Sequence, residues 1–135
     1  MLFEAQPQVD IHEMSPLALA FVGDAVLELL VRQRLVETTR LPPGKLHSTA
    51  THYVSAHAQH LELALVEPLL TEEEQAILRR GKNASKASVA KHATPQEYRA
   101  STGFECLLGW LHLKGRDDRV QELFEVLWNG YDPHQ

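Results

Sequence analysis

Residues 17–35 read LALAFVGDAVLELLVRQRL, a stretch in which apolar side chains recur at helical spacing. Ser15 and Pro16 come directly before it. This pair is a good helix start, because serine caps a helix and proline favours the first helical position. We therefore expect a helix over residues 16–37, which the LPPG sequence at 41–44 follows and breaks.

Outward from this helix, the sequence predicts further helices and shows no strand alternation. Capping boxes begin at Thr71 and Thr94, and Gly115 separates the last two periodic stretches. Residues 83–93 are small, polar and basic, which is typical of a loop. The expected further helices cover residues 45–66, 71–81, 94–114 and 117–129, with Gly130 as the final cap.

The chain has 135 residues, the size of one domain, and 44% of them are apolar. We expect a single all-α helical bundle over residues 15–130, preceded by an irregular arm over 1–14. One cysteine, Cys106, excludes an intramolecular disulfide and a cysteine-based zinc knuckle. The longest apolar run is six residues and no secretory signal is seen, so we expect a soluble, cytoplasmic protein with no membrane partner.

Two carboxylates interrupt apolar helices. Asp24 falls in the middle of the stripe expected to face the core, and Gly23 beside it permits close approach of another helix or a ligand. Glu105 lies inside the apolar stretch GFECLLGWLHL at 103–113. An unpaired buried carboxylate is costly, so each is either bonded within the bundle or part of a shared cation site. The expected stripe contains Leu17, Ala20, Phe21, Asp24, Leu27, Glu28 and Val31.

Magnesium suits such a pair, because it keeps several waters and takes only one or two protein carboxylates plus phosphate oxygens. Asp24 and Glu105 are therefore the candidate metal-binding and catalytic residues, with structural carboxylates as the alternative. Glu28 is either a third ligand or the i,i+4 partner of Arg32, and the pair is favoured. Cys106 follows Glu105 by one residue and is expected in the core.

Four histidines fall in the second expected helix, but they form no HExxH motif. His57 and His60 can share a face, yet no acidic ligand is adjacent in the sequence. We therefore expect no zinc site there, and the histidines add pH-dependent positive charge. The four are His47, His52, His57 and His60.

The net charge of −5 argues against a nucleic-acid partner as a total, but it is unevenly distributed. No acidic residue lies between Glu74 and Glu97, a stretch that contains five basic residues. Residues 38–61 also lack acids and contain two basic residues. The rest of the chain carries −12. The segment 82–91 is therefore either a loop that follows RNA phosphates or a solvated loop without a ligand. The candidate RNA-binding residues are Arg79, Arg80, Lys82, Lys86, Lys91 and Arg99.

FVGDAVL at residues 21–27 resembles the signature FLGDAVL of the ribonuclease III family. GFECLLGWL at 103–111 resembles the family's second acidic motif, and residues 44–59 resemble the helix that follows the signature. LRRGKNASK at 78–86 resembles the basic segment of the Mini-ribonuclease III branch, whose members are nuclease domains without a double-stranded-RNA-binding domain. The larger family has acids where this chain has Leu17, Ala20, Pro43 and Thr102.

The resemblance implies a Mg²⁺-dependent endoribonuclease that cleaves double-stranded RNA and leaves 5′-phosphate and 3′-hydroxyl ends. It also implies maturation of the large-subunit (23S) ribosomal RNA precursor by a two-fold homodimer with Phe21 at the interface. The number of metal ions and the participation of a ribosomal protein stay open. The alternatives are a non-catalytic helical RNA-binding or ribosome-assembly module and a helical scaffold for a protein partner.

Overall fold

The computed structural model describes residues 3–85 and 92–134, which form six α-helices, two short 3₁₀ turns and no strand. The predicted all-α class is confirmed. None of the helices in these residues is long and apolar enough to span a bilayer. One 3₁₀ turn, Ile11–Glu13, lies in the expected irregular arm, and the other is Glu67–Leu69. The helices are α1 (Pro16–Thr38), α2 (Pro43–Val54), α3 (Ala56–Val66), α4 (Glu72–Ala84), α5 (Pro95–Leu113) and α6 (Asp117–Gly130).

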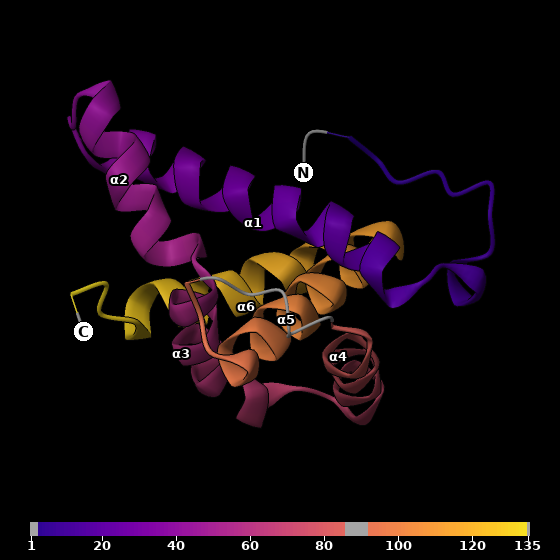
Figure 1. Ribbon diagram of the computed structural model, residues 1–135. Helices are drawn as coiled ribbons and strands as arrows, with labels where there is room; N and C mark the ends of the chain where they lie inside the picture. The colour runs from indigo at the N-terminus through magenta and orange to yellow at the C-terminus, as the bar shows by residue number, and fades with distance from the viewer. Residues whose placement is uncertain (1–2, 86–91, 135) are drawn as a thin grey trace.

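Helix α5 lies in the middle of the molecule, with α1 along one side and α3, α4 and α6 packed around it (Figure 1). After its polar first turns, α5 is apolar on nearly every side, and a helix segment of that kind is stable only when other elements surround it. The core accordingly gathers on α5, whose side chains pack against all four neighbours. Its fully buried members are Phe104, Cys106, Leu107, Leu108, Trp110 and Leu111.

The single helix expected over 45–66 is wrong, because the chain breaks at Ser55 into α2 and α3. Ser55 has extended backbone angles, and its hydroxyl accepts a hydrogen bond from the amide of Ala58 at 3.1 Å. Serine favours such caps because its hydroxyl competes with helical hydrogen bonding. The break lets α2 pack against α1 while α3 packs against α5.

Two helix ends also differ from the prediction. Helix α4 continues past Gly81 to Ala84, because Gly81 serves a helix contact: a Cβ there would lie 2.6 Å from the Cβ of Cys106. Cys106 is buried, as expected. Helix α6 includes Gly130, and its cap residue is Tyr131. Among the described glycines only Gly115 has a positive φ, 75°, which ends the turn after α5.

The buried face of α1 is rotated from the expected stripe. Gly23 faces the core while Asp24 is exposed, and Phe21 is 83% exposed. Helix α1 is apolar on more than one side, so its periodicity alone does not identify the side that meets α5. The buried residues of α1 are Leu19, Ala20, Gly23, Val26, Leu27, Val31 and Leu35.

Candidate metal centre

The site lies where α1 and α5 cross in close contact. A Cβ on Gly23 would lie 1.7 Å from the carbonyl oxygen of Glu105, and one on Gly109 would lie 1.9 Å from the carbonyl oxygen of Leu19. Only glycine at both positions permits this distance between the helices. The expectation that Gly23 admits a close neighbour is confirmed, and the neighbour is α5.

This crossing brings together the two carboxylates predicted from the sequence. Asp24 follows Gly23 on α1, and it lines the same depression as Glu105 on α5, whose pKa it raises. Asp24 is exposed and Glu105 is half-buried, so the pair is open to solvent from one side. Both lie in a depression of about 320 Å³, which is also lined by Leu17, Ala20, Phe21, Tyr98 and Thr102.

The electrostatics of this pair disfavour two negative charges. Burial raises the pKa of the Glu105 carboxyl to about 8, although a hydrogen bond from Gln59 opposes the rise. The charges of Asp24 and Glu28 raise this pKa further. A cation between the carboxylates would remove this penalty, because it supplies the opposite charge that the pair lacks.

The surroundings of the pair fit a hydrated divalent cation. Neither Asp24 nor Glu105 forms an ion pair with a basic side chain within residues 3–85 and 92–134. Glu28 instead pairs with Arg32 at 2.9 Å, as predicted. No cluster of three or more Asp, Glu, His or Cys side chains in the described residues could hold a metal. The site thus offers two carboxylates and leaves other positions to water or phosphate, the donor set that Mg²⁺ accepts.

Three positions where the resembled family carries acids lie at the same depression. Leu17, Ala20 and Thr102 all line it, whereas Pro43 lies elsewhere, at the start of α2. The Thr102 hydroxyl lies 3.0 Å from the Tyr98 carbonyl oxygen and 3.3 Å from the Ser85 hydroxyl. It therefore joins α5 to Ser85, the residue that caps the end of α4, at a point one helical turn before Glu105.

Sequence reasoning missed two side chains near this region. Gln59 on α3 is buried and donates a hydrogen bond to Oε2 of Glu105 at 3.2 Å. His57, for which no acidic neighbour was expected, hydrogen-bonds through Nδ1 with Glu97 at the start of α5. Each pair spans 40 or more residues of sequence. No local motif could therefore have revealed either contact.

The predicted RNA-binding residues have unequal surroundings. Arg79, Arg80 and Arg99 are exposed and form no ion pair in the described part of the chain. Lys82 is half-buried, and its Nζ lies 3.7 Å from Oε1 of Glu67. Lys86 and Lys91 lie outside the described residues.

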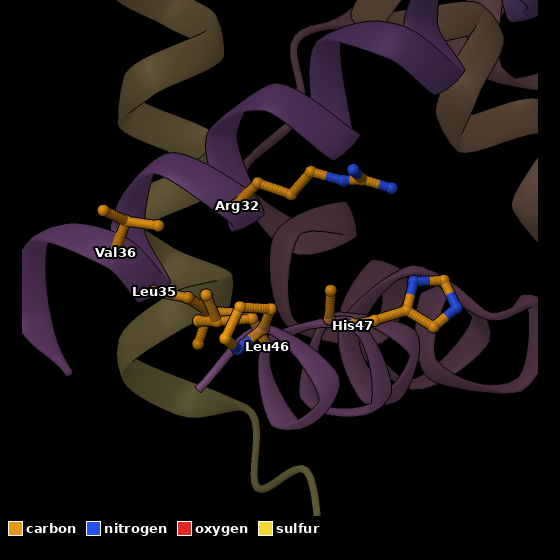
Figure 2. Close-up of a pocket in the computed structure, with 7 residues that line it drawn as sticks. Arg32, Leu35, Val36, Leu46 and His47 are labelled. Carbon is orange, nitrogen blue, oxygen red and sulfur yellow. The ribbon is translucent and has the colours of Figure 1, made fainter. Parts of the chain in front are cut away.

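A second groove, between the end of α1 and α2, does not resemble the carboxylate site (Figure 2). Its volume is about 270 Å³, and it contains no acidic residue. Arg32 extends along α1 away from the apolar cluster formed by Leu35 and Leu46. The groove is lined by Arg32, Leu35, Val36, Pro43, Leu46, His47 and Ala50.

Comparison with known proteins identifies the family of the chain. Residues 17–116 match the family model described as Ribonuclease III domain. The chain is 45% identical to Mini-ribonuclease 3 of Enterococcus faecalis, over 84% of this chain and 88% of that protein. It is 46% identical to Mini-ribonuclease 3 of Symbiobacterium thermophilum, over 84% and 87%.

A solved structure shares the fold. The crystal structure of a Fusobacterium nucleatum protein superposes with a TM-score of 0.81 at 27% identity, covering 90% of this chain and 97% of that chain. The predicted ribonuclease III-like helical bundle is thereby confirmed. The chain therefore belongs to the ribonuclease III family, and within that family of endoribonucleases to the Mini-ribonuclease 3 branch.

Proposed function

We propose that this chain is a Mg²⁺-dependent endoribonuclease that cleaves double-stranded RNA, with Asp24 and Glu105 as its metal-binding and catalytic residues. One observation carries the proposal: the α1–α5 crossing places these two carboxylates together in an open depression, without a basic partner among the described residues. Glu74, a buried carboxylate on the neighbouring helix α4, does have such a partner in Arg119.

The chemistry assigned to the site is hydrolysis of a phosphodiester. Asp24 and Glu105 hold the cation from two different helices, so its place depends on the rigid α1–α5 crossing. A bound Mg²⁺ supplies the positive charge that stabilises a phosphoryl group under attack by water. The products carry 5′-phosphate and 3′-hydroxyl ends.

A two-fold homodimer is part of the same proposal. Phe21, 83% exposed, and Leu17, 42% exposed, lie on the rim of the depression beside Asp24. Large apolar side chains that project into solvent favour burial against a partner. A second copy on this face would bring two carboxylate sites together, one for each RNA strand.

The RNA is held by basic residues in the second half of α4, at the start of α5 and in the segment between the two helices. Arg79, Arg80, Lys82 and Arg99 flank the segment that carries Lys86 and Lys91. Ser85, at the start of this segment, lies against Thr102 at the depression, so RNA phosphates bound there approach Asp24 and Glu105. Such contacts follow the shape of an A-form helix rather than its bases.

Within double-stranded RNA we propose the large-subunit (23S) ribosomal RNA precursor as the substrate. Membership of the Mini-ribonuclease 3 branch supports this choice. A cytoplasmic location fits such a substrate, and a ribosomal protein bound to the precursor is a further candidate partner.

The test is cleavage of structured precursor RNA by wild-type protein, Asp24→Asn and Glu105→Gln, with and without Mg²⁺, followed by mapping of the new ends. Each substitution should lower the cleavage rate by about 10²–10³-fold or more, because it removes one ligand of the charge-stabilising cation. Thermal unfolding should show that both variants fold. Glu28→Gln is the matched control and should cleave at nearly the wild-type rate, because Glu28 is engaged with Arg32.

Full cleavage by Asp24→Asn in Mg²⁺ would overturn the mechanism. RNA binding by the wild type without Mg²⁺-dependent cleavage would favour a non-catalytic RNA-binding or ribosome-assembly module instead. Absence of RNA binding even at low salt would favour a scaffold for a protein partner.

A further inference from the structure

Gln59 is a buried amide whose orientation is set by two acceptors. Its side chain is 1% exposed, and Nε2 donates to the carbonyl oxygen of Val54 at 2.9 Å and to Oε2 of Glu105 at 3.2 Å. Both partners accept hydrogen bonds, so the amide nitrogen must face them. Within the described residues Oε1 has no hydrogen-bond partner, so both hydrogen bonds of the amide are made by its donor nitrogen.

The break between α2 and α3 makes this contact possible. Val54 is the last residue of α2, where carbonyl oxygens lack partners within the helix. The chain turns at Ser55, and Gln59 then reaches back from the first turns of α3 to the Val54 carbonyl. This bond fixes the side chain on the α2–α3 corner while its second N–H points to α5.

Gln59 lies behind the site rather than in it. The depression that contains Asp24 and Glu105 is not lined by Gln59, whose link to the site is its hydrogen bond to Oε2 of Glu105. A cation or RNA in the depression would therefore meet Glu105 without touching Gln59. Any influence of Gln59 on the reaction must pass through Glu105.

We propose that Gln59 is a positioning residue that holds one oxygen of Glu105 and so fixes the carboxylate for a divalent cation. This inference rests on the proposed function, in which Asp24 and Glu105 bind that cation. Residues that hydrogen-bond to metal ligands set their orientation, and their loss commonly weakens metal binding about 10- to 100-fold. The bond from Gln59 restricts the rotation of the partly buried Glu105 side chain.

The test measures Mn²⁺ binding by the RNA-free protein, using calorimetry or electron paramagnetic resonance. Gln59→Met keeps the length of the side chain and removes the donor, and it should weaken Mn²⁺ binding about tenfold. In the cleavage assay the same variant should need a higher Mg²⁺ concentration, with most of the rate recovered at saturation. In a Glu105→Gln background, Gln59→Met should have no further effect on Mn²⁺ binding.

Gln75→Met is the matched control. Gln75 on α4 also donates from Nε2 to a carbonyl five residues earlier, that of Leu70 at 3.3 Å, but it reaches no carboxylate. It should therefore leave Mn²⁺ affinity unchanged. If Gln59→Met proves unfolded, Gln59→Asn keeps the amide but is too short for both acceptors, and it should also weaken Mn²⁺ binding.

The outcomes separate this inference from the proposed function. Wild-type Mn²⁺ affinity in a folded Gln59→Met or Gln59→Asn variant would overturn the role of Gln59, even if the wild type cleaves RNA. Equal weakening by Gln75→Met would also overturn it, because the effect would then be a general loss of stability. Failure of the wild type to cleave RNA in Mg²⁺ would overturn the proposed function, while the Mn²⁺ measurements would still decide whether Gln59 positions Glu105.

Discussion

Glu74 and Glu105 lie on neighbouring helices, but their carboxylates have opposite surroundings. Glu74 is 3% exposed, and its two oxygens accept hydrogen bonds from Nη2 and Nε of Arg119, each at 2.9 Å. One of these oxygens also accepts from the amide of Thr71 in the capping box. Glu105 has Gln59 as a donor and a second carboxylate, Asp24, as its neighbour.

The pKa values follow these surroundings. Burial alone would raise the pKa of Glu74, but the hydrogen bonds and charge of Arg119 and the bonds from Thr71 hold it below its usual value. Burial and Asp24 instead raise the pKa of Glu105 to about 8, against the hydrogen bond from Gln59. A carboxylate with an arginine partner stabilises the fold, whereas one that faces another carboxylate is suited to bind a cation.

The strongest test of this contrast exchanges each glutamate for glutamine. Glu105→Gln should lower the cleavage rate by about 10²–10³-fold while leaving the metal-free free energy of unfolding unchanged or higher at pH 8.5, because it removes one of two repelling charges. Single-turnover cleavage measures the rate, and urea unfolding measures the stability. A marked loss of stability in this variant would identify Glu105 as structural and remove the contrast.

Glu74→Gln should show the reverse pattern. It leaves Arg119, whose side chain is 23% exposed, without its main partner, and should lower the free energy of unfolding by about 2–3 kcal/mol at pH 7. Cleavage measured well below the unfolding temperature should be nearly unchanged. Because the folded-state pKa of Glu74 is lowered, this stabilisation is present above pH 4.5 and is lost as the pH falls through the folded-state value. A difference between wild type and variant that persists at lower pH would contradict the assignment.

Glu62 on α3 is a third case, a buried carboxylate without an ionic partner in the part of the chain that the structure describes. It is 0% exposed, and neither oxygen has a hydrogen-bond partner in the described residues. Burial raises the pKa of Glu62 to about 8. Burial also raises the pKa values of Tyr53 and Tyr131, and the charge of Glu62 raises them further. The folded protein therefore holds a proton that the unfolded chain releases above pH 4.5.

This proton makes folding less favourable as the pH rises. Between pH 4.5 and about 8 the contribution of Glu62 to the free energy of unfolding should fall by about 1.4 kcal/mol per pH unit, and above that range it should be constant. Glu62→Gln mimics the protonated form, so its stability relative to the wild type should increase over this interval. Urea unfolding from pH 4 to 9 gives the difference curve, from which contributions common to both proteins, such as Glu105, cancel. Parallel curves would show that Glu62 does not titrate this way.

The same contrast, between paired and unpaired charges, applies to arginine side chains, and it predicts the smallest effects of substitution. Arg119 is engaged by Glu74 and Glu122, whereas Arg79 and Arg80 are exposed and form no ion pair in the described part of the chain. Arg79→Ala and Arg80→Ala should each weaken RNA binding only a few-fold near 0.15 M salt and reduce the logarithmic salt slope by about one.

Arg116→Ala is the control for this prediction. Arg116 is partly exposed like the RNA-binding candidates, but it pairs with Glu73 at 2.8 Å. It should leave the salt slope of RNA binding unchanged. A slope that changes for Arg116→Ala but not for Arg79→Ala would contradict the assignment of Arg79 to the RNA surface and favour a surface around Arg116.

The sequence by itself determined the helices that carry the site. Local signals suffice for this, because caps such as Ser15, Thr71 and Thr94 form hydrogen bonds within three residues. Glu105 could likewise be singled out, because a carboxylate within an apolar stretch is costly to bury unless it has a partner. The break at Ser55 was missed, because periodicity continues across it and the cap becomes decisive only when α2 and α3 pack on different partners.

Only the tertiary structure decided which side chains meet. The sequence placed Asp24 on the core face of α1, but the contact of Gly23 and Gly109 turned Gly23 inward and left Asp24 at the open rim beside Glu105. The same packing brought Gln59 to Glu105 across 46 residues. Periodicity and caps are local properties of the chain, whereas the rotation of a helix about its own axis is set by the closest contact it makes with another helix.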